Sequence, residues 1–234
     1  MLGFTFRNQH TSEFEGLVIK TVSNPLLASK RVKKISVPGR DGSYVFEDGF
    51  ENKQLEFKCI VAKGNIQERR LRLREIAAWL SGTGDLVLDH EPDKTYRIVR
   101  AVSDVGLSLD KITDEFNLVF EAEPFQLGEL HSVSVDNPTS FNVTNNGNVT
   151  ADTLISILGT GNVTATCGAV SFSLAGMTEM LYMDSKRMLV YNGAIANNLP
   201  KHTGTFIKLS PGNNTITISG TVSNVSVEFH DTFI

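Results

Sequence analysis

Short apolar runs alternate with turn residues along the first 130 positions of the chain. Six runs have the alternation or the β-branched content that is typical of strands, and turn residues bound each of them. They cover residues 16–22, 31–37, 53–61, 84–89, 95–102 and 115–122. The first part of the chain is therefore predicted to be rich in strands.

One segment of this first part has the period of a helix, residues 65–84. Asn65 can cap its start, Glu68 stands three residues later as the partner of a capping box, and Gly82 can end it. Its apolar positions recur at i, i+3, i+4 and i+7, and they are Leu73, Ile76, Ala77 and Leu80. Trp79 lies beside this stripe and is expected in the core. The first part is thus predicted to be α+β.

The remainder of the chain shows only strand patterns. These cover residues 153–159, 170–174, 179–184, 187–191, 204–210, 214–220 and 225–231. Gly, Asn and Pro separate them at the spacing expected of a β-sandwich. An all-β second domain is therefore predicted.

Charge supports a division into two domains. Residues 1–130 hold 18 of the 22 Lys and Arg residues and 20 of the 26 Asp and Glu residues, although they are little more than half of the 234-residue chain. We place the boundary between residues 130 and 131, near a shift in composition over residues 128–137. The net charge of -4 argues against broad neutralisation of a nucleic acid. The start of the chain lacks the pattern of a signal peptide, and its two cysteines exclude a disulfide framework.

The segment 36–49 concentrates turn-forming residues between apolar runs. Its three turn-forming pairs are Pro38–Gly39, Asp41–Gly42 and Asp48–Gly49. The first suits the centre of a type II turn, and the other two are predicted to be tight turns. Such a segment can cradle an anion or form a rigid corner that another chain contacts. A P-loop is excluded, because a strand follows instead of Gly-Lys-Ser/Thr and a helix.

Two basic clusters each have two interpretations. In residues 29–37, cations are interspersed with apolar residues, which fits a nucleic-acid patch or an exposed edge strand protected by lysines. Arg69, Arg70, Arg72 and Arg74 crowd one turn of the predicted helix. They form either a solvated face or a contact with a neighbouring subunit, because arginine is favoured at interfaces.

The sequence offers no convincing catalytic or metal site. The five histidines are scattered, and no Gly-x-Ser-x-Gly motif occurs. Asp89, Glu91 and Asp93 resemble the start of a calcium loop, but Lys94 and Arg100 occupy the positions that need glycine and glutamate. We therefore expect a solvated turn there, and a protein with no enzymatic activity, no metal and no cofactor.

The order of these features resembles the distal tail protein family of long-tailed, non-contractile bacteriophages. The segments that carry the resemblance are "VPGRDGSYVFEDGFENKQLEFKCIV", "RLREIAAWLSGTGDLVLDHEPDKTY" and "FNLVFEAEPF" in the first half. In the second half, "MLYMDSKRMLVYNG" and "KLSPGNNTITISG" are similar to the galectin-like sandwich of that family. The resemblance covers nearly the whole chain.

The resemblance implies a mainly β fold with an N-terminal α+β ring-forming domain, split-barrel-like with one helix, and a C-terminal galectin-like β-sandwich. It implies a structural protein of the virion tail tip, assembled in the host cytoplasm as a hexameric ring. Its partners would be the tail tube protein, the tail-associated tip protein and a receptor-binding protein on the second domain, with no membrane and no sequence-specific nucleic acid. The candidate subunit-interface residues are Arg40, Asp41, Asp48, Arg69, Arg70 and Arg72.

Two other functions compete with this interpretation. A carbohydrate-binding module acting alone would rely on the second half, which has no tryptophan and whose aromatic residues mostly fit core positions. A glycosidase would need a pair of carboxylates that the sequence does not locate. Oligomeric state separates the ring-forming hub from both.

Overall fold

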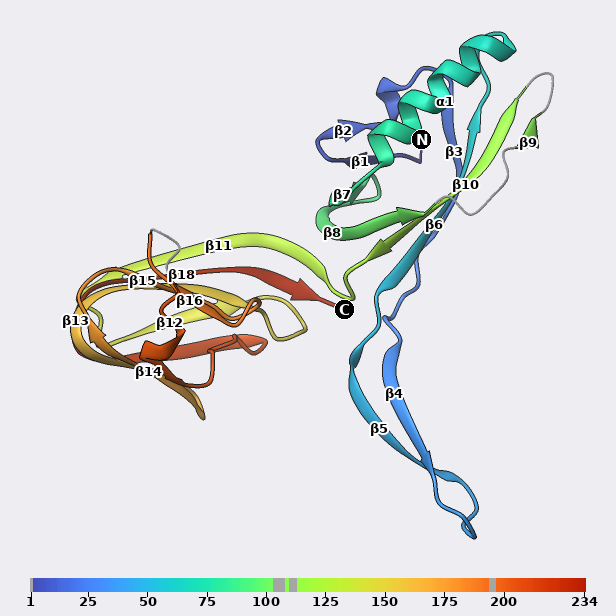
Figure 1. Cartoon of the computed structure of the whole chain (residues 1–234). Coiled ribbons are helices and arrows are strands. Elements are labelled where there is room, and N and C mark those ends of the chain that lie inside the picture. Colours follow the sequence, from blue (N-terminus) through green and yellow to red (C-terminus); the bar gives the residue numbers. More distant parts are fainter. Residues whose placement is uncertain (1, 103–107, 110–112, 194–196) are drawn as a thin grey trace. The chain divides into compact units, whose positions relative to one another are not determined.

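The computed structural model describes residues 2–102, 108–109, 113–193 and 197–234 (Figure 1). It divides into two compact units, the first comprising Met1–Gln126 with Ile234 and the second Leu127–Phe233. The division falls a few residues before the change in composition at residue 130. In the described part of the chain, no helix has the length and apolar character needed to cross a membrane.

The first unit is built from antiparallel strands and one long helix. Its strands are β1 (Phe4–Phe6), β2 (Gln9–His10), β3 (Leu17–Ser23), β4 (Lys30–Ser36), β5 (Ser43–Phe50), β6 (Lys53–Val61), β7 (Gly84–Leu88), β8 (Glu91–Val102), β9 (Ser108–Leu109) and β10 (Asp114–Ala122). Strand β8 pairs with β7 along its first part and with β10 near its end. The order β2-β1-β7-β8-β10-β6-β3 therefore bends around one core.

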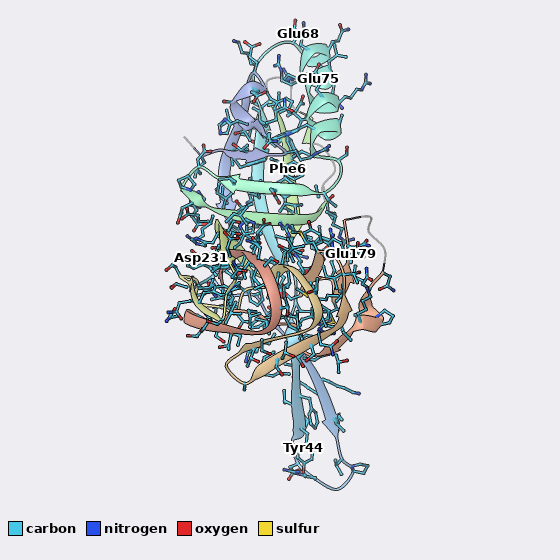
Figure 2. The ribbon with its side chains drawn as sticks, turned by 90° about the vertical axis from the view of Figure 1, so that its left-hand side faces the viewer. Phe6, Tyr44, Glu68, Glu75, Glu179 and Asp231 are labelled. Atoms are coloured by element: carbon cyan, nitrogen blue, oxygen red, sulfur yellow. The ribbon has the colours of Figure 1, made fainter. Side chains whose placement is uncertain are left out.

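Helix α1 (Ile66–Leu80) begins as predicted. The Asn65 side chain accepts the N–H of Glu68, and the Glu68 carboxylate accepts the N–H of Asn65, which confirms the capping box. Trp79 is buried as expected: its ring stacks on Phe4 with centroids 5.6 Å apart, and its indole N–H donates to the Phe6 carbonyl at 3.0 Å. Figure 2 shows Phe6 inside the unit and Glu68 at the far end of the helix, where its first turn lies.

The buried stripe of α1 differs from the predicted one at one position. Ile76 and Leu80 are buried and Leu73 is half-buried, but Ala77 is exposed. Arg69 takes the remaining inward position, seven residues before Ile76, and is 1% exposed. The prediction that Ala77 is buried was wrong, because the buried stripe continues toward the start of the helix with the charged side chain of Arg69.

The second unit is a two-layered β-sandwich. Its strands are β11 (Gln126–Asp136), β12 (Ser140–Asn145), β13 (Thr153–Cys167), β14 (Val170–Met177), β15 (Leu181–Asp184), β16 (Leu189–Tyr191), β17 (His202–Gly204) and β18 (Gly212–Phe233). The first part of β13 pairs with β15, and its last part pairs with β14. Strand β18 pairs with both parts of β13, and also with β12 and β11. These two long strands thus contribute to both layers around one apolar core.

Three strand predictions in this unit were wrong or incomplete. Residues 214–220 and 225–231 belong to the single strand β18, which bends where its register with β13 shifts. Residues 204–210 are mostly irregular, with one bridge between Leu209 and Ala151. Ile207 and Leu209 are nevertheless buried, so the apolar alternation correctly marked inward positions without a strand. Strands β11 and β12 were missed.

Candidate subunit interface

The most exposed element of the first unit is the hairpin formed by β4 and β5. Every residue from Arg31 to Gly49 is exposed. The two strands form a sheet of their own, and neither pairs with another strand among the described residues. Figure 1 shows this hairpin, in blue, extending from the first unit, and Figure 2 shows Tyr44 near its tip. An isolated two-stranded hairpin is marginally stable in water, so this element is suited to contact another surface.

The tip of the β4–β5 hairpin has the turn that the sequence predicts. Gly39 has φ 80°, and the Arg40 N–H donates to the Val37 carbonyl at 3.2 Å, as in a type II turn with Pro38 at its second position. The Arg40 guanidinium lies over the ring of Tyr44, 4.2 Å from its centroid. The tip is therefore a corner stiffened by its own side chains. Asp41 lies beside it and is exposed.

The predicted tight turn at Asp48–Gly49 is wrong. Both residues lie inside β5, where the pairing shifts between Lys30↔Phe50 and Val32↔Glu47. Gly49 has φ 76°, which glycine adopts at a β-bulge without steric cost. Asp48 is exposed, and its carbonyl accepts from the Arg31 side chain at 2.7 Å.

The two faces of the hairpin differ in polarity. Ile35 lies opposite Tyr44, and Lys33 lies opposite Phe46, so these four residues share one face. Ile35, Tyr44 and Phe46 are 42%, 48% and 54% exposed. A contiguous set of exposed apolar side chains on a protruding element is typical of a protein–protein contact. Candidate interface residues Arg40 and Asp41 lie at the tip next to this face.

Charge is segregated between the two strands. Strand β4 carries Lys30, Arg31, Lys33 and Lys34 and no acidic residue, whereas β5 carries Glu47 and Asp48 and no basic one. An ion pair between Lys30 and Glu47 closes the base of the hairpin. This pair is exposed and contributes at most about 1 kcal/mol to stability. The separation of positive and negative charge between the two strands therefore contributes little to the stability of the hairpin, and its main effect is on contact with a partner.

Arg69 is not available to a neighbouring subunit. Its side chain is buried, its Nε donates to the Asp114 carboxylate at 3.1 Å, and its Nη1 donates to the Gly64 carbonyl at 2.9 Å. Asp114 is also 1% exposed. The expectation that Arg69 lies at a subunit interface is therefore corrected: it ties the start of α1 to β10 inside the unit.

The other helix arginines remain at the surface. Arg70 is half-buried, and Arg74 is exposed. Arg72 is half-buried and donates to the Lys63 carbonyl at 3.2 Å and to the Glu15 carboxylate at 3.4 Å. Arg70 and Arg72 are thus retained as candidate contact residues, with Arg72 partly engaged within its own chain.

A buried polar cluster at the root of the hairpin escaped the sequence analysis. The hydroxyl of Tyr96 donates to Glu91 at 2.7 Å and accepts from Asn24 and Gln126 at 2.5 and 2.7 Å. The pKa of Tyr96 is raised mainly by burial and, to a smaller extent, by the hydrogen bond to Glu91. Lys53 is 2% exposed and its Nζ lacks a hydrogen-bond partner among the described residues. Burial lowers the pKa of Lys53, which the Glu91 carboxylate opposes. Only the spatial proximity of β3, β6 and β8 reveals this group.

Ser12, His10 and Asp89 have the contacts of a serine–imidazole–carboxylate trio. The Ser12 hydroxyl lies 2.7 Å from His10 Nδ1, and His10 Nε2 lies 3.0 Å from the Asp89 carboxylate. The backbone N–H of Ser12 also donates to Nδ1 at 3.1 Å, while the Glu13 carboxylate accepts the His10 N–H at 3.1 Å. This reciprocal pattern is a helix cap, because it satisfies the first amides of the short helix Thr11–Glu13.

Asp231 is at the centre of a polar network in the sandwich. Asp231 accepts hydrogen bonds from His131 at 2.8 Å and from the backbone and side-chain nitrogens of Asn146 at 2.8 and 3.2 Å. Burial alone would raise the pKa of Asp231, but these hydrogen bonds lower it overall. They hold β11, the segment after β12, and β18 together. Across the described residues, no group of three or more His, Cys, Asp and Glu side chains is arranged to hold a metal ion.

The first unit is similar to a known protein family. Residues 15–122 match the family model of the phage tail protein RIFT-related domain. The matched residues all lie in the first unit. This match includes the β4–β5 hairpin and helix α1. No curated protein sequence matches the chain.

Solved structures extend the likeness to the second unit. The whole chain matches the crystal structure of the SPP1 Dit protein, described as a paradigm of the hub adsorption apparatus in phages that infect Gram-positive bacteria. The TM-score is 0.79 at 16% sequence identity, and the match covers 100% of both chains. A chain of the phage P2 baseplate in its activated conformation with Ca matches with a TM-score of 0.50 at 6% identity, covering 98% of each chain. At these low identities the structural match shows the fold alone. Together with the family match of residues 15–122, it confirms the expected resemblance to phage distal tail proteins.

Proposed function

We propose that the chain is the hub subunit of a long-tailed phage tail tip. Six copies form a ring through their first units, and the ring joins the tail tube to the adhesion apparatus of the virion. The full-length match to the SPP1 Dit hub, together with the family match of residues 15–122, carries this proposal. The protein acts without catalysis, as a connector made in the host cytoplasm and built into the virion tail tip.

The β4–β5 hairpin is the arm that contacts the neighbouring subunit. A ring of identical subunits uses heterologous contacts, so one surface of each copy must fit a different surface of the next. The contact residues are Arg40, Asp41 and Asp48 on the hairpin and Arg70 and Arg72 on α1. The apolar side chains of the hairpin supply affinity, because burying the exposed half of a residue such as Phe46 is worth about 1 kcal/mol.

Light scattering at several protein concentrations, with negative-stain microscopy of the same samples, tests the ring. We expect a hexamer with six-fold rings, weakened by salt because charged pairs fix its orientation. Phe46→Ser should shift assembly to higher concentration and leave thermal unfolding unchanged. Leu130→Ser, at a residue 57% exposed in the second unit, is the matched control and should assemble normally. A wild-type protein that stays monomeric throughout would refute the proposal.

The division of labour between the units is part of the proposal. Residues 1–126 should fold and assemble by themselves, because that unit has its own core and carries the arm. Residues 127–233 should fold as a monomer. If the isolated sandwich formed the oligomer and the first unit did not, the assignment of the ring to the first unit would be wrong.

A further inference from the structure

Both edges of the β4–β5 hairpin have unpaired backbone groups. The hairpin forms a two-stranded sheet, and the described residues include no strand that pairs with either outer edge. Exposed edges of this kind are templates for pairing with another chain. Residues 31–49 are exposed along their whole length, so nothing in the described first unit covers these edges.

The two edges carry opposite charge. Strand β4 has four basic residues and no acidic ones, and β5 has two acidic residues and no basic ones. Two β4 edges placed side by side would bring eight cations together, and two β5 edges would bring four carboxylates together. A β4 edge against a β5 edge instead pairs cations with carboxylates. Charge thus disfavours both symmetric contacts and favours the heterologous one.

We propose that the β4 edge of one copy pairs with the β5 edge of the next copy, so that neighbouring hairpins form one continuous sheet. The proposal rests on the ring proposed above and specifies how its arms meet. When an antiparallel hairpin is repeated side by side, each β4 lies next to a β5 that runs in the opposite direction. Every new backbone ladder is therefore antiparallel. A closed ring of hairpins leaves no free edge, which also removes the hazard of open-ended aggregation.

The bulge in β5 limits the length of this contact. The register shift at Asp48–Gly49 bends the strand, so the regular edge comprises Ser43–Glu47. The facing regular segment of β4 is Val32–Ser36. Over this length, Ile35 and Tyr44 of successive copies form a continuous apolar row, and Lys33 alternates with Phe46 in the row beside it. Within these segments β4 carries Lys33 and Lys34, which disfavour pairing with a second β4 edge, and β5 carries the carboxylate of Glu47.

Cysteine cross-linking tests the edge assignment in the full-length chain. Lys34 and Val45 are exposed and share one hairpin face, since they lie opposite each other across the hairpin. Lys34→Cys and Val45→Cys are made as separate variants and co-expressed, then treated with a short bismaleimide. The native thiols of Cys59 and Cys167 are buried, which keeps the background low. We expect covalent dimers in the co-assembled sample and none in either variant alone.

The outcomes separate this inference from the proposed function. An oligomer that gives no cross-link between the two variants overturns edge pairing and leaves the ring intact. Cross-linking of the Lys34→Cys variant to itself also overturns it, because β4 would then meet β4. A protein that stays monomeric contradicts both. Leu71→Cys on α1, at a residue 57% exposed, is the control and should not cross-link to Lys34→Cys.

Discussion

Replacing Arg69 with Met should destabilise the first unit by about 3–5 kcal/mol, because it leaves the Asp114 carboxylate buried without its cation. The side chains of Arg69 and Asp114 are 2% and 1% exposed, and the charged groups are 3.1 Å apart. Water cannot solvate the orphaned carboxylate at that depth. The loss also includes the hydrogen bond from Arg69 to the Gly64 carbonyl, about 1 kcal/mol.

Trp79 gives a direct assay for this effect. It is the single tryptophan of the chain, and it packs against Phe4, Phe6 and Phe14 in the core of the first unit. Its fluorescence during urea unfolding therefore reports the first unit separately from the sandwich. With an m-value of about 2 kcal/mol/M, the expected loss lowers the urea midpoint by roughly 1.5–2.5 M.

An exposed ion pair on the same sheet provides the control. Lys20 and Glu115 are 2.7 Å apart with side chains about half exposed, so Lys20→Met should cost less than about 1 kcal/mol. Combining Arg69→Met with Asp114→Leu should recover most of the stability lost in the single variant, because both charges are then removed. The reasoning is refuted if Arg69→Met costs no more than Lys20→Met, or if the double variant is as unstable as the sum of its parts.

Three further predictions concern other buried groups. Lys53→Met should stabilise the first unit by about 1–3 kcal/mol at pH 7 in the Trp79 assay, because the ammonium is buried without a hydrogen-bond partner. The pKa of Lys53 in the folded chain lies below the ordinary 10.5, so the unfolded chain binds the proton more tightly. The stability gained by Lys53→Met should therefore shrink as pH rises toward 10.5. A gain in stability that is independent of pH would contradict this. Asp231→Asn should destabilise the sandwich by about 1–3 kcal/mol at neutral pH in calorimetry. Because the folded pKa of Asp231 is lowered, the difference should disappear as pH falls through that value, below 3.8; an unchanged difference in acid would argue otherwise. Burial raises the pKa of Cys59 to about 12 and also raises that of Cys167. Neither thiol should therefore react with maleimide at pH 7 until the chain unfolds. Rapid labelling of the native protein would disprove this.

Features that depend on neighbouring residues in the sequence were predictable. The capping box of α1 needs only Asn65 and Glu68, three positions apart, and the type II turn needs only Pro38 and Gly39. Strand β6 matched its predicted range, because its residues alternate between buried and exposed from Lys53 to Cys59 and an apolar run completes it. In each case the physical cause acts within a few residues, so the pattern alone was sufficient.

Features that depend on distant partners were not predictable. Arg69 looks like a surface residue until Asp114, 45 positions later in the sequence, is brought against it. Residues 214–220 and 225–231 were predicted as two strands, yet Gly220, with φ 113°, lies within a single strand whose pairing shifts register nearby. The candidate interface divides in a similar way. The turn before Arg40 followed from the sequence, whereas an exposed edge strand was one of two interpretations of the basic segment, and the structure shows that the whole hairpin is exposed.

The two long strands of the sandwich affect when each unit can fold during synthesis. Strand β18 lies in both layers and pairs with β11, β12 and β13, so the sandwich lacks a central strand until nearly all of its residues have been made. The first unit is complete, apart from Ile234, once Gln126 has emerged. At 5–20 residues per second, the rest of the chain follows roughly 5–20 s later. The nascent chain thus presents a folded first unit, with its hairpin exposed, while the sandwich is still unstructured on the ribosome.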